Sequence, residues 1–157
     1  MENVNIILNN KKYKQALKKI EEYEKDREFC NHTIEHFMDV SRIAYIMILE
    51  ENLNVSKEIV YAIGLLHDIG RVKQYEEGIH HDIASVEISR EILKETSFTK
   101  NEINIILNGI ANHRKESDNK LEEIIYKADK LSRQCFNCKS EQECYWSNEK
   151  KNFKITY

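Results

Sequence analysis

The residues of this chain that are most able to do chemistry are histidines and aspartates set in apolar, helix-like stretches. His36 comes first, the adjacent pair His67-Asp68 follows, and Asp129 comes last. An unpaired polar group in such a setting would cost about 2–7 kcal/mol. A metal ion removes that cost, because neutral imidazoles and carboxylates around a divalent cation are compensated. The series therefore predicts a metal site shared by separate helices.

Two further histidines, His81 and His113, make the set large enough for two metals. Four neutral imidazoles and two carboxylates carry a charge of −2, and two divalent ions bring +4. The remaining positive charge attracts a phosphate and a hydroxide, as phosphoester hydrolysis requires. Nitrogen and oxygen ligands suit Fe, Mn, Co, Ni or Zn, and the spacing does not choose among these metals.

Histidine–aspartate pairs occur twice, and their contexts separate them. His67-Asp68 ends the apolar run AIGLL, so both side chains should meet the interior near a helix end. Asp82, in the pair His81-Asp82, belongs to the first turn of a predicted helix. The helix dipole favours a carboxylate there without any ligand role.

In its order, spacing and helical setting, the series resembles the signature of the HD-domain superfamily of metal-dependent phosphohydrolases. The similarity covers roughly residues 31–132, and HFMDVSRIA and LLHDIGR are its two best local motifs. The resemblance implies that a first metal is bound by His36, His67, Asp68 and Asp129. It also implies a second metal in binuclear members, bound by His81 and His113, with Asp68 bridging the two ions.

One position in this ligand set has a competitor. His80 adjoins His81, and we favour His81 because Ser85, four residues further on, matches a small-residue position of the HHDIAS motif. His32 lies one turn before His36, on the same face of the predicted helix, and is a weaker candidate for a role at the site.

Basic side chains beside the proposed ligands are candidates for binding a substrate phosphate. Arg71 lies three residues after Asp68, and Lys130 adjoins the last ligand of the series. Arginine would bind with a bidentate fork and lysine as a point charge. We expect Asp68 and Arg71 to be catalytic, and Arg71 and Lys130 to bind substrate. A solvated surface position is the alternative for both cations, and it is our interpretation of Arg114 and Arg133.

The four cysteines form a second pattern, which the resemblance does not require. Cys135 and Cys138 have the CxxC spacing of a metal knuckle or a redox pair, and Cys144 follows. Cys30 lies six residues before the first predicted ligand, and Cys135 six residues after the last. If those helices run antiparallel and share a metal, both cysteines are displaced about 9 Å in the same direction. The pattern predicts a four-thiolate site for Zn or an iron–sulfur cluster, with four reduced thiols as the alternative.

Composition is that of an ordinary globular protein, taken as a single domain over residues 1–157. The chain is 41% hydrophobic and 32% charged, and its net charge of −3 implies no general attraction to nucleic acid or membrane. No apolar run approaches the roughly 18 residues of a membrane span, and the start lacks the pattern of a signal peptide. We therefore expect a cytoplasmic protein whose thiols are reduced or bind metal. The oligomeric state stays open.

The absence of proline and the presence of only four glycines favour helices over an all-β fold. Apolar residues at helical spacing predict helices over 10–27, from Asn31 to about Glu50, from Ser56 to a C′ glycine at Gly70, and from His81 to Glu95. The helix after Ser56 is apolar on all sides and should be central. The predicted fold is an all-α HD-type bundle of about six or seven helices. The N-terminal helix and the cysteine-containing tail, about 135–157, should pack on it.

Turn and cap signals complete this prediction. The polar segment from Val72 to Gly78 is predicted as a loop. Thr99 begins a capping box for a further helix, and Ser117 or Asp118 should cap a last long one. A second capping box, at 140–143, predicts a short helix before the tail.

We expect a phosphohydrolase that cleaves a phosphoester or nucleotide phosphoanhydride with a metal-activated water. Its partner would be a small phosphorylated substrate, with nucleotides among the candidates. One alternative is a non-catalytic sensor that binds metal and nucleotide. Another is a di-iron oxygenase, which would use the same ligand set to oxidise its substrate with oxygen.

Overall fold

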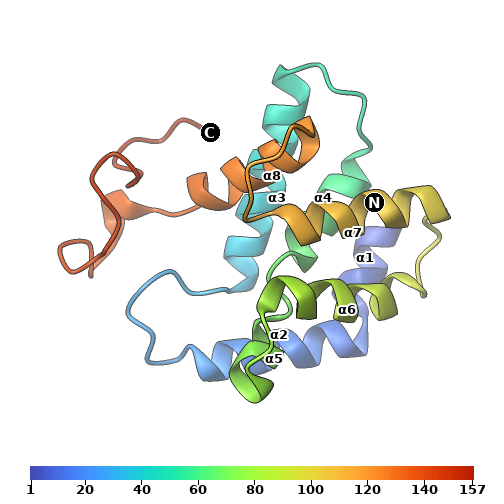
Figure 1. Cartoon of the computed structure of the whole chain (residues 1–157), viewed down its shortest axis with the longest axis horizontal. Coiled ribbons are helices and arrows are strands. Elements are labelled where there is room, and N and C mark those ends of the chain that lie inside the picture. The colour runs from blue at the N-terminus through green and yellow to red at the C-terminus, as the bar shows by residue number, and fades with distance from the viewer.

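The computed structural model describes all 157 residues and contains helices and turns but no strand. Its elements are α1 (Glu2–Asn9), α2 (Lys11–Tyr23), α3 (Ile34–Glu50), α4 (Lys57–Leu66), α5 (Arg71–Glu77), α6 (His81–Leu93), α7 (Lys100–Asn112), α8 (Lys120–Leu131) and the one-turn 3₁₀ helix η1 (Cys135–Asn137). Figure 1 shows the helices gathered in one body, with the C-terminal segment, in red, lying to one side. The predicted all-α fold is confirmed.

Helix α4 lies at the centre of the bundle. Seven of its ten residues are buried, and α1, α3 and α7 pack around it, as its uniformly apolar sequence predicted. Helix α3 comes very close at Gly64, where an added Cβ would lie 2.2 Å from the hydroxyl of Ser41. The turn that follows this central helix carries His67 and Asp68, and both side chains are buried in the interior of the bundle.

The predicted helix starts agree with the structure in part. Thr99 caps α7 with a complete capping box. The Thr99 hydroxyl accepts a hydrogen bond from the Glu102 N–H, and the Glu102 carboxylate accepts one from the Thr99 N–H. Helix α8 is capped by Asn119, whose side-chain oxygen accepts two N–H groups of the first turn. The prediction of Ser117 or Asp118 was therefore wrong by one or two residues.

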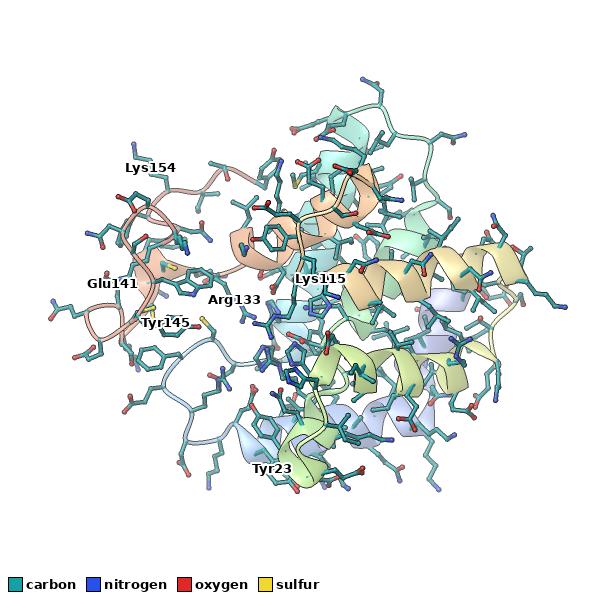
Figure 2. The ribbon with its side chains drawn as sticks, viewed as in Figure 1. Tyr23, Lys115, Arg133, Glu141, Tyr145 and Lys154 are labelled. Carbon is teal, nitrogen blue, oxygen red and sulfur yellow. The ribbon has the colours of Figure 1, made fainter.

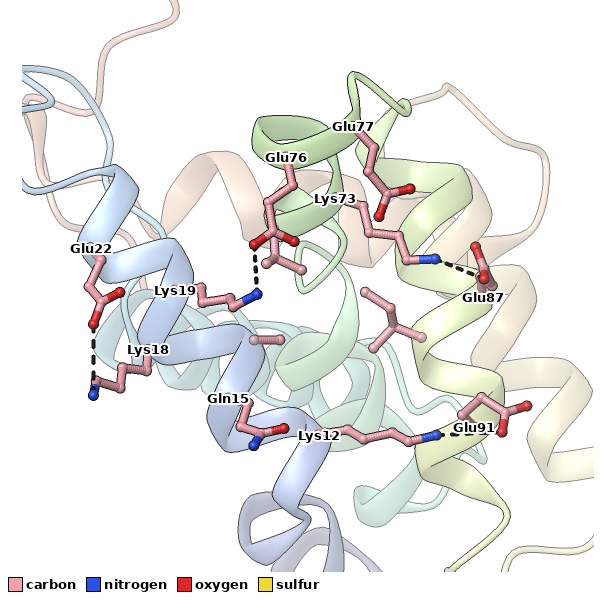
Figure 3. Close-up of a pocket in the computed structure, with 13 residues that line it drawn as sticks. Lys12, Gln15, Lys18, Lys19, Glu22, Lys73, Glu76, Glu77, Glu87 and Glu91 are labelled. Atoms are coloured by element: carbon pink, nitrogen blue, oxygen red, sulfur yellow. Dashed lines mark hydrogen bonds and ion pairs between the residues drawn. The ribbon is translucent and has the colours of Figure 1, made fainter.

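Two short helices, α1 and α5, occupy segments where no helix was predicted. The interpretation of residues 72–78 as a loop was wrong, because their polarity is that of a helix lying on the surface with only Val72 buried. Figure 3 shows the groove that α5 forms with α2 and α6, where Lys19 of α2 pairs with Glu76 of α5 at 2.7 Å. Gly78 ends α5 with a left-handed φ of 70°.

Gly70 does not have the role predicted for it. Helix α4 ends at Leu66, and Gly70 has a right-handed φ of −70° directly before α5, so it is not a left-handed C′ residue. An added Cβ there would lie 2.2 Å from the backbone nitrogen of Ser85 and 2.3 Å from the carbonyl oxygen of His81. Its N–H also donates to the Ser85 hydroxyl at 2.8 Å. Glycine therefore allows α6 to approach the turn that carries Asp68.

The chain after α8 has little regular structure. Turns over 139–143 replace the short helix predicted there, because this segment has no apolar face to pack on the bundle. Asn152 ties the tail back by donating to the carbonyls of Lys130 and Arg133, at 2.6 Å and 3.0 Å. No helix combines the length and the apolar character needed to span a lipid bilayer.

Candidate metal centre

The six predicted ligands come from separate helices and meet in the interior. His36 lies in the first turn of α3, His67 and Asp68 follow α4, His81 begins α6, His113 follows α7, and Asp129 lies in the last turn of α8. All are buried except Asp129, whose side chain is 22% exposed. The bundle thus gathers residues that are up to 93 positions apart.

The ligand atoms form two groups, each with all of its atoms within 4.8 Å of one another. The first contains His36, His67, Asp68 and Asp129, and the second contains Asp68, His81 and His113. Asp68 Oδ2 lies 3.7 Å from His67 Nε2, while Asp68 Oδ1 lies 3.3 Å from His81 Nε2 and 3.6 Å from His113 Nε2. Asp68 is the one residue common to both groups.

Two imidazoles are oriented by their own helices. The Nδ1–H of His67 donates to the carbonyl of Gly64 at 2.8 Å, and that of His113 donates to the carbonyl of Ile110 at 2.6 Å. Each Nε2 is thereby left as an acceptor that faces the cluster. These two Nε2 atoms and Asp68 Oδ1 are buried without any hydrogen-bond partner. Such atoms are costly unless a cation meets them, so these residues fit a metal site.

Side chains from neighbouring elements orient two further imidazoles. His81 donates to the side-chain oxygen of Gln74 at 3.0 Å. His36 donates to the hydroxyl of Ser132 at 3.0 Å, and Ser132 donates in turn to the carbonyl of Asp129 at 2.6 Å. Histidines that bind metals in proteins are held by second hydrogen bonds of this kind.

His32 contributes more than predicted, although the reason given for it was wrong. Helix α3 begins two residues after His32, which therefore shares no helix face with His36. Its buried ring nevertheless lies between two carboxylates, with Nε2 3.2 Å from Asp68 Oδ2 and Nδ1 2.6 Å from Glu24 Oε1. Burial raises the pKa of Glu24, but hydrogen bonds from His32 and Tyr75 outweigh burial and lower that pKa to about 2. Glu24 therefore stays ionised and holds His32 against Asp68.

The carboxylates of the cluster are ionised despite their burial. Burial raises the pKa of Asp68, but the neighbouring imidazoles of His113 and His32 outweigh burial and hold the pKa well below its ordinary value. The imidazoles around Asp129 have the same effect on the pKa of that carboxyl. The centre therefore presents two negative charges to a cation.

Acid should destabilise the metal-free protein. Burial lowers the pKa of His36 to about 3 and that of His81 to about 4, from 6.5. His113 opposes this effect in part, because the nearby Asp68 carboxylate raises the pKa of His113 in spite of burial. Below pH 6.5, the unfolded chain binds more protons at His36 and His81 than the folded protein does. The free energy of unfolding therefore decreases as the pH is lowered. We expect the melting temperature of chelator-treated protein to fall between about pH 7 and pH 4.5.

A matched pair of variants tests the origin of this pH dependence. His36→Asn removes one buried imidazole and should flatten the decline in melting temperature. His80→Asn, at an exposed position outside the cluster, should keep the wild-type decline. A wild-type melting temperature that does not change over this range would contradict the prediction.

The structure separates the two histidine–aspartate pairs. It places His81 in the cluster and leaves His80 exposed, just before α6. Asp82 accepts the N–H of Ile83 at 2.9 Å within the first turn of α6 and does not reach the cluster.

A pocket of about 330 Å³ opens onto the cluster, and its lining includes Asp68, His113 and Asp129. Five cationic side chains also line it, namely Arg27, Arg71, Arg114, Lys130 and Arg133. Three aromatic side chains complete the wall, namely Tyr126, Tyr145 and Trp146. The larger groove of Figure 3, about 670 Å³, lies away from the cluster, and its lysines and glutamates are paired across it.

The two predicted phosphate-binding cations both line this pocket. Arg71 Nε lies 3.4 Å from Asp68 Oδ1, and only 17% of the Arg71 side chain is exposed. The ammonium group of Lys130 lies over the ring of Tyr126, 3.1 Å from its centre. Arg71 is therefore the closer of the two to the carboxylate shared by both groups.

Two arginines interpreted as surface residues reach the cluster, and that interpretation was wrong for Arg133. Arg133 Nη2 lies 3.0 Å from His36 Nε2, and its side chain is only 12% exposed. Arg114 is exposed overall, yet its Nη1 lies 3.4 Å from His81 Nε2. Figure 2 shows Arg133 reaching from the start of the tail toward the centre of the bundle. Each arginine faces a lone pair that a metal would use.

A family model described as HD domain matches residues 33–134. The chain belongs to the HD-domain family. The match begins before His36 and extends beyond Asp129, so it contains all six predicted ligands of this HD-domain protein. The match leaves out α1, α2 and most of the tail. It also leaves out all four cysteines, namely Cys30, Cys135, Cys138 and Cys144.

Three relatives match this HD-domain protein over different lengths. An uncharacterised protein of Clostridium beijerinckii is 50% identical over 157 residues and all of both chains. Ribonuclease Y of Mycoplasma mycoides is 30% identical over 106 residues, which are 66% of this chain and 23% of that enzyme. An uncharacterised protein of Methanocaldococcus jannaschii is 37% identical over 70 residues, 42% of this chain and 40% of the relative. No solved structure gives a significant match.

Proposed function

We propose that this HD-domain protein is a phosphohydrolase that uses divalent metal ions to cleave a phosphoester or phosphoanhydride bond. The observation that carries the proposal is one shared carboxylate, Asp68, which lies between two potential metal groups on the floor of a cationic pocket. Members of the family are generally metal-dependent hydrolases, which supports the same reaction class. We further propose a reducing, cytoplasmic location, since four cysteines are present without a disulfide.

The centre fits one or two divalent transition ions, held by His36, His67, Asp68 and Asp129 and by Asp68, His81 and His113. When bound, such ions lower the pKa of water and stabilise charge on a phosphoryl group. The donor types suit Fe, Mn, Co, Ni or Zn. The pair Glu24–His32 positions Asp68 by holding its Oδ2 from the side opposite to His81 and His113, which face Oδ1.

Charge in the pocket favours an anionic substrate. Its five cations outnumber the carboxylates of Asp68 and Asp129 in the lining. Arg71 is placed to hold a phosphate oxygen with its guanidinium fork, next to the cluster. Arg114 and Arg133 already donate toward the cluster, so they can neutralise charge on a phosphoryl group bound there.

The aromatic wall favours a substrate that carries a base. Tyr126 comes from α8, while Tyr145 and Trp146 come from the tail, so two distant segments offer flat surfaces beside the cations. Stacking of one base on an aromatic side chain contributes about 1–3 kcal/mol. We therefore propose nucleotides as the substrate class, with Lys130 and Arg71 among the phosphate contacts.

Arg71→Gln should raise KM for a phosphorylated substrate by about tenfold to a hundredfold, as loss of a charge-assisted hydrogen bond implies. The change also removes a cation beside Asp68, so kcat should fall. Arg90→Gln, an exposed position on α6 outside the pocket, should leave both constants unchanged. Equal kinetics of wild type and Arg71→Gln would contradict the proposed phosphate contact.

A turnover screen tests the reaction class. Protein loaded separately with Mn, Co, Ni, Fe or Zn would be assayed against phosphomonoesters, nucleoside polyphosphates, cyclic nucleotides and a short RNA. The RNA is included because one relative is named a ribonuclease. Metal-dependent release of phosphate or a nucleotide supports the proposal. Tight nucleotide binding without product under every metal would favour the sensor alternative, and oxygen consumption by the iron form would favour the oxygenase.

A further inference from the structure

We propose that Cys30, Cys135, Cys138 and Cys144 form a second metal centre, in which four thiolates bind a zinc-type ion or an iron–sulfur cluster. All four cysteines line one pocket of about 220 Å³, although Cys30 lies over a hundred residues from the others. The pocket lies between the loop that joins α2 to α3 and the C-terminal tail. None of the four belongs to the His–Asp cluster.

The four thiols come from two distant segments of the chain and line one pocket. Each cysteine is half-buried and free of a disulfide. Cys135 and Cys138 lie at the two ends of the one-turn helix η1, which is the CxxC arrangement of a metal knuckle. Cys30 has a left-handed φ of 42°, a costly conformation for a residue with a side chain.

The tail needs a cross-link of this kind. Beyond η1 it contains only turns, so its backbone has few regular hydrogen bonds. Several of its large apolar side chains are exposed, namely Phe136, Tyr145, Phe153, Ile155 and Tyr157. A segment without a core is normally stabilised by a disulfide or a structural metal. Figure 2 shows Glu141 and Tyr145 on the part of the tail that turns toward the loop between α2 and α3.

Metal binding would draw the sulfurs together. No three of them lie within 4.8 Å of one another, whereas a tetrahedral Zn–S distance of about 2.3 Å gives sulfur separations of about 3.8 Å. Arg133 and Lys151 line the same pocket and oppose the negative charge of a four-thiolate site, although Glu35, Asp39 and Glu141 line it too. Lys151 is bound to Glu141 at 2.6 Å. Closure of the site is therefore coupled to ordering of the tail.

The centre has a consequence for the neighbouring pocket. Trp146 lies two residues after Cys144 and lines both the cysteine pocket and the pocket above the His–Asp cluster. A metal bound by the cysteines would hold this part of the wall in place. This consequence rests on the proposed function, but the site itself does not.

Metal analysis of the anaerobically purified full chain tests the site without any activity assay. Asp68→Ala, which disables the His–Asp cluster, should retain one metal centre. The double variant Asp68→Ala/Cys138→Ser should lose it, and Asp68→Ala/Ser140→Ala, a matched change in the same tail, should keep it. Zinc without acid-labile sulfide identifies a single ion, and iron with sulfide and a visible chromophore identifies a cluster. Either result supports the proposal.

Two measurements on the wild-type protein avoid any dependence on variant folding. The four thiols should be unreactive toward a thiol reagent until a chelator removes the metal. Trp146 is the only tryptophan, so its fluorescence should change when the chelator acts and recover when metal is returned. Four reactive thiols in metal-free native protein, a disulfide between any two cysteines, or equal metal content in the two double variants would overturn the proposal.

Discussion

Asp68→Ala should abolish turnover and remove metal from both groups of the His–Asp cluster. Asp68 is the only residue present in both groups, and its two oxygens face different imidazoles. The substitution therefore removes one charge and one ligand from each metal position. Loss of a partner outside the ligand shell typically costs about 10–100-fold, so loss of this shared ligand should cost more than about 100-fold in activity.

Two comparisons make this prediction specific. His113→Ala affects only the second group, so it should weaken one metal and leave the other partly bound. Asp82→Ala removes a carboxylate from the first turn of α6, where the helix dipole favours it, so it should cost only about 0.3–1 kcal/mol of stability. Metal content by mass spectrometry and turnover of the active substrate would be measured for all three. Full metal content and turnover in Asp68→Ala would contradict the assignment.

Gly70→Ala should be the most damaging single-methyl change in the chain. Its Cβ would lie 2.2 Å from the Ser85 nitrogen and 2.3 Å from the His81 oxygen, and both are backbone atoms that cannot rotate away. Helix α6 must move outward, and the bond from Gly70 to the Ser85 hydroxyl is lost with it. We expect a loss of about 3 kcal/mol or more in the free energy of unfolding, at the upper end of overpacking costs.

The same displacement carries His81 away from Asp68, so the second metal should be lost before the first. Urea unfolding and metal analysis of Gly70→Ala would measure the two effects. Gly78→Ala is a matched control, because Gly78 has a left-handed φ of 70° but an added Cβ meets nothing within 4 Å. It should cost about 1–2 kcal/mol and leave metal binding intact. Equal stability of the two variants would show that α6 does not approach as closely as described.

The helices that carry the ligands could be predicted because their signals are local. The apolar run of α4 and the capping box of Thr99 are contained in a few neighbouring residues. Helix α5 was missed because its polarity resembles that of a loop, and its helical state depends on packing against α2 and α6. Gly70 was misjudged for a related reason, since the need for glycine comes from α6, fifteen residues further on at Ser85.

The site divides in the same way. The six predicted ligands were assigned from their types, their order and the resemblance to the HD-domain signature, and the structure brings them together. Glu24 could not be selected, because it was one of many charged residues in the helix predicted over 10–27. In the structure that helix ends at Tyr23, and Glu24 follows it. Trp146 was missed because only the return of the tail places it in the pocket. Arg133 was interpreted as a surface residue, although it lies four residues after Asp129 and contacts it. A Gln or Ser that orients an imidazole has no signature in the sequence at all.

The loop that joins α2 to α3 places Cys30 and His32 with a single residue between them, and both side chains line the pocket above the His–Asp cluster. Cys30 also lines the cysteine pocket, and His32 lies 3.2 Å from the Asp68 carboxylate at the centre of the bundle. A metal bound by Cys30 would restrain this short piece of backbone and, with it, the position of His32. If metals bind at both the cysteine site and the His–Asp cluster, any effect of one on the affinity of the other must be matched by an equal effect in the opposite direction.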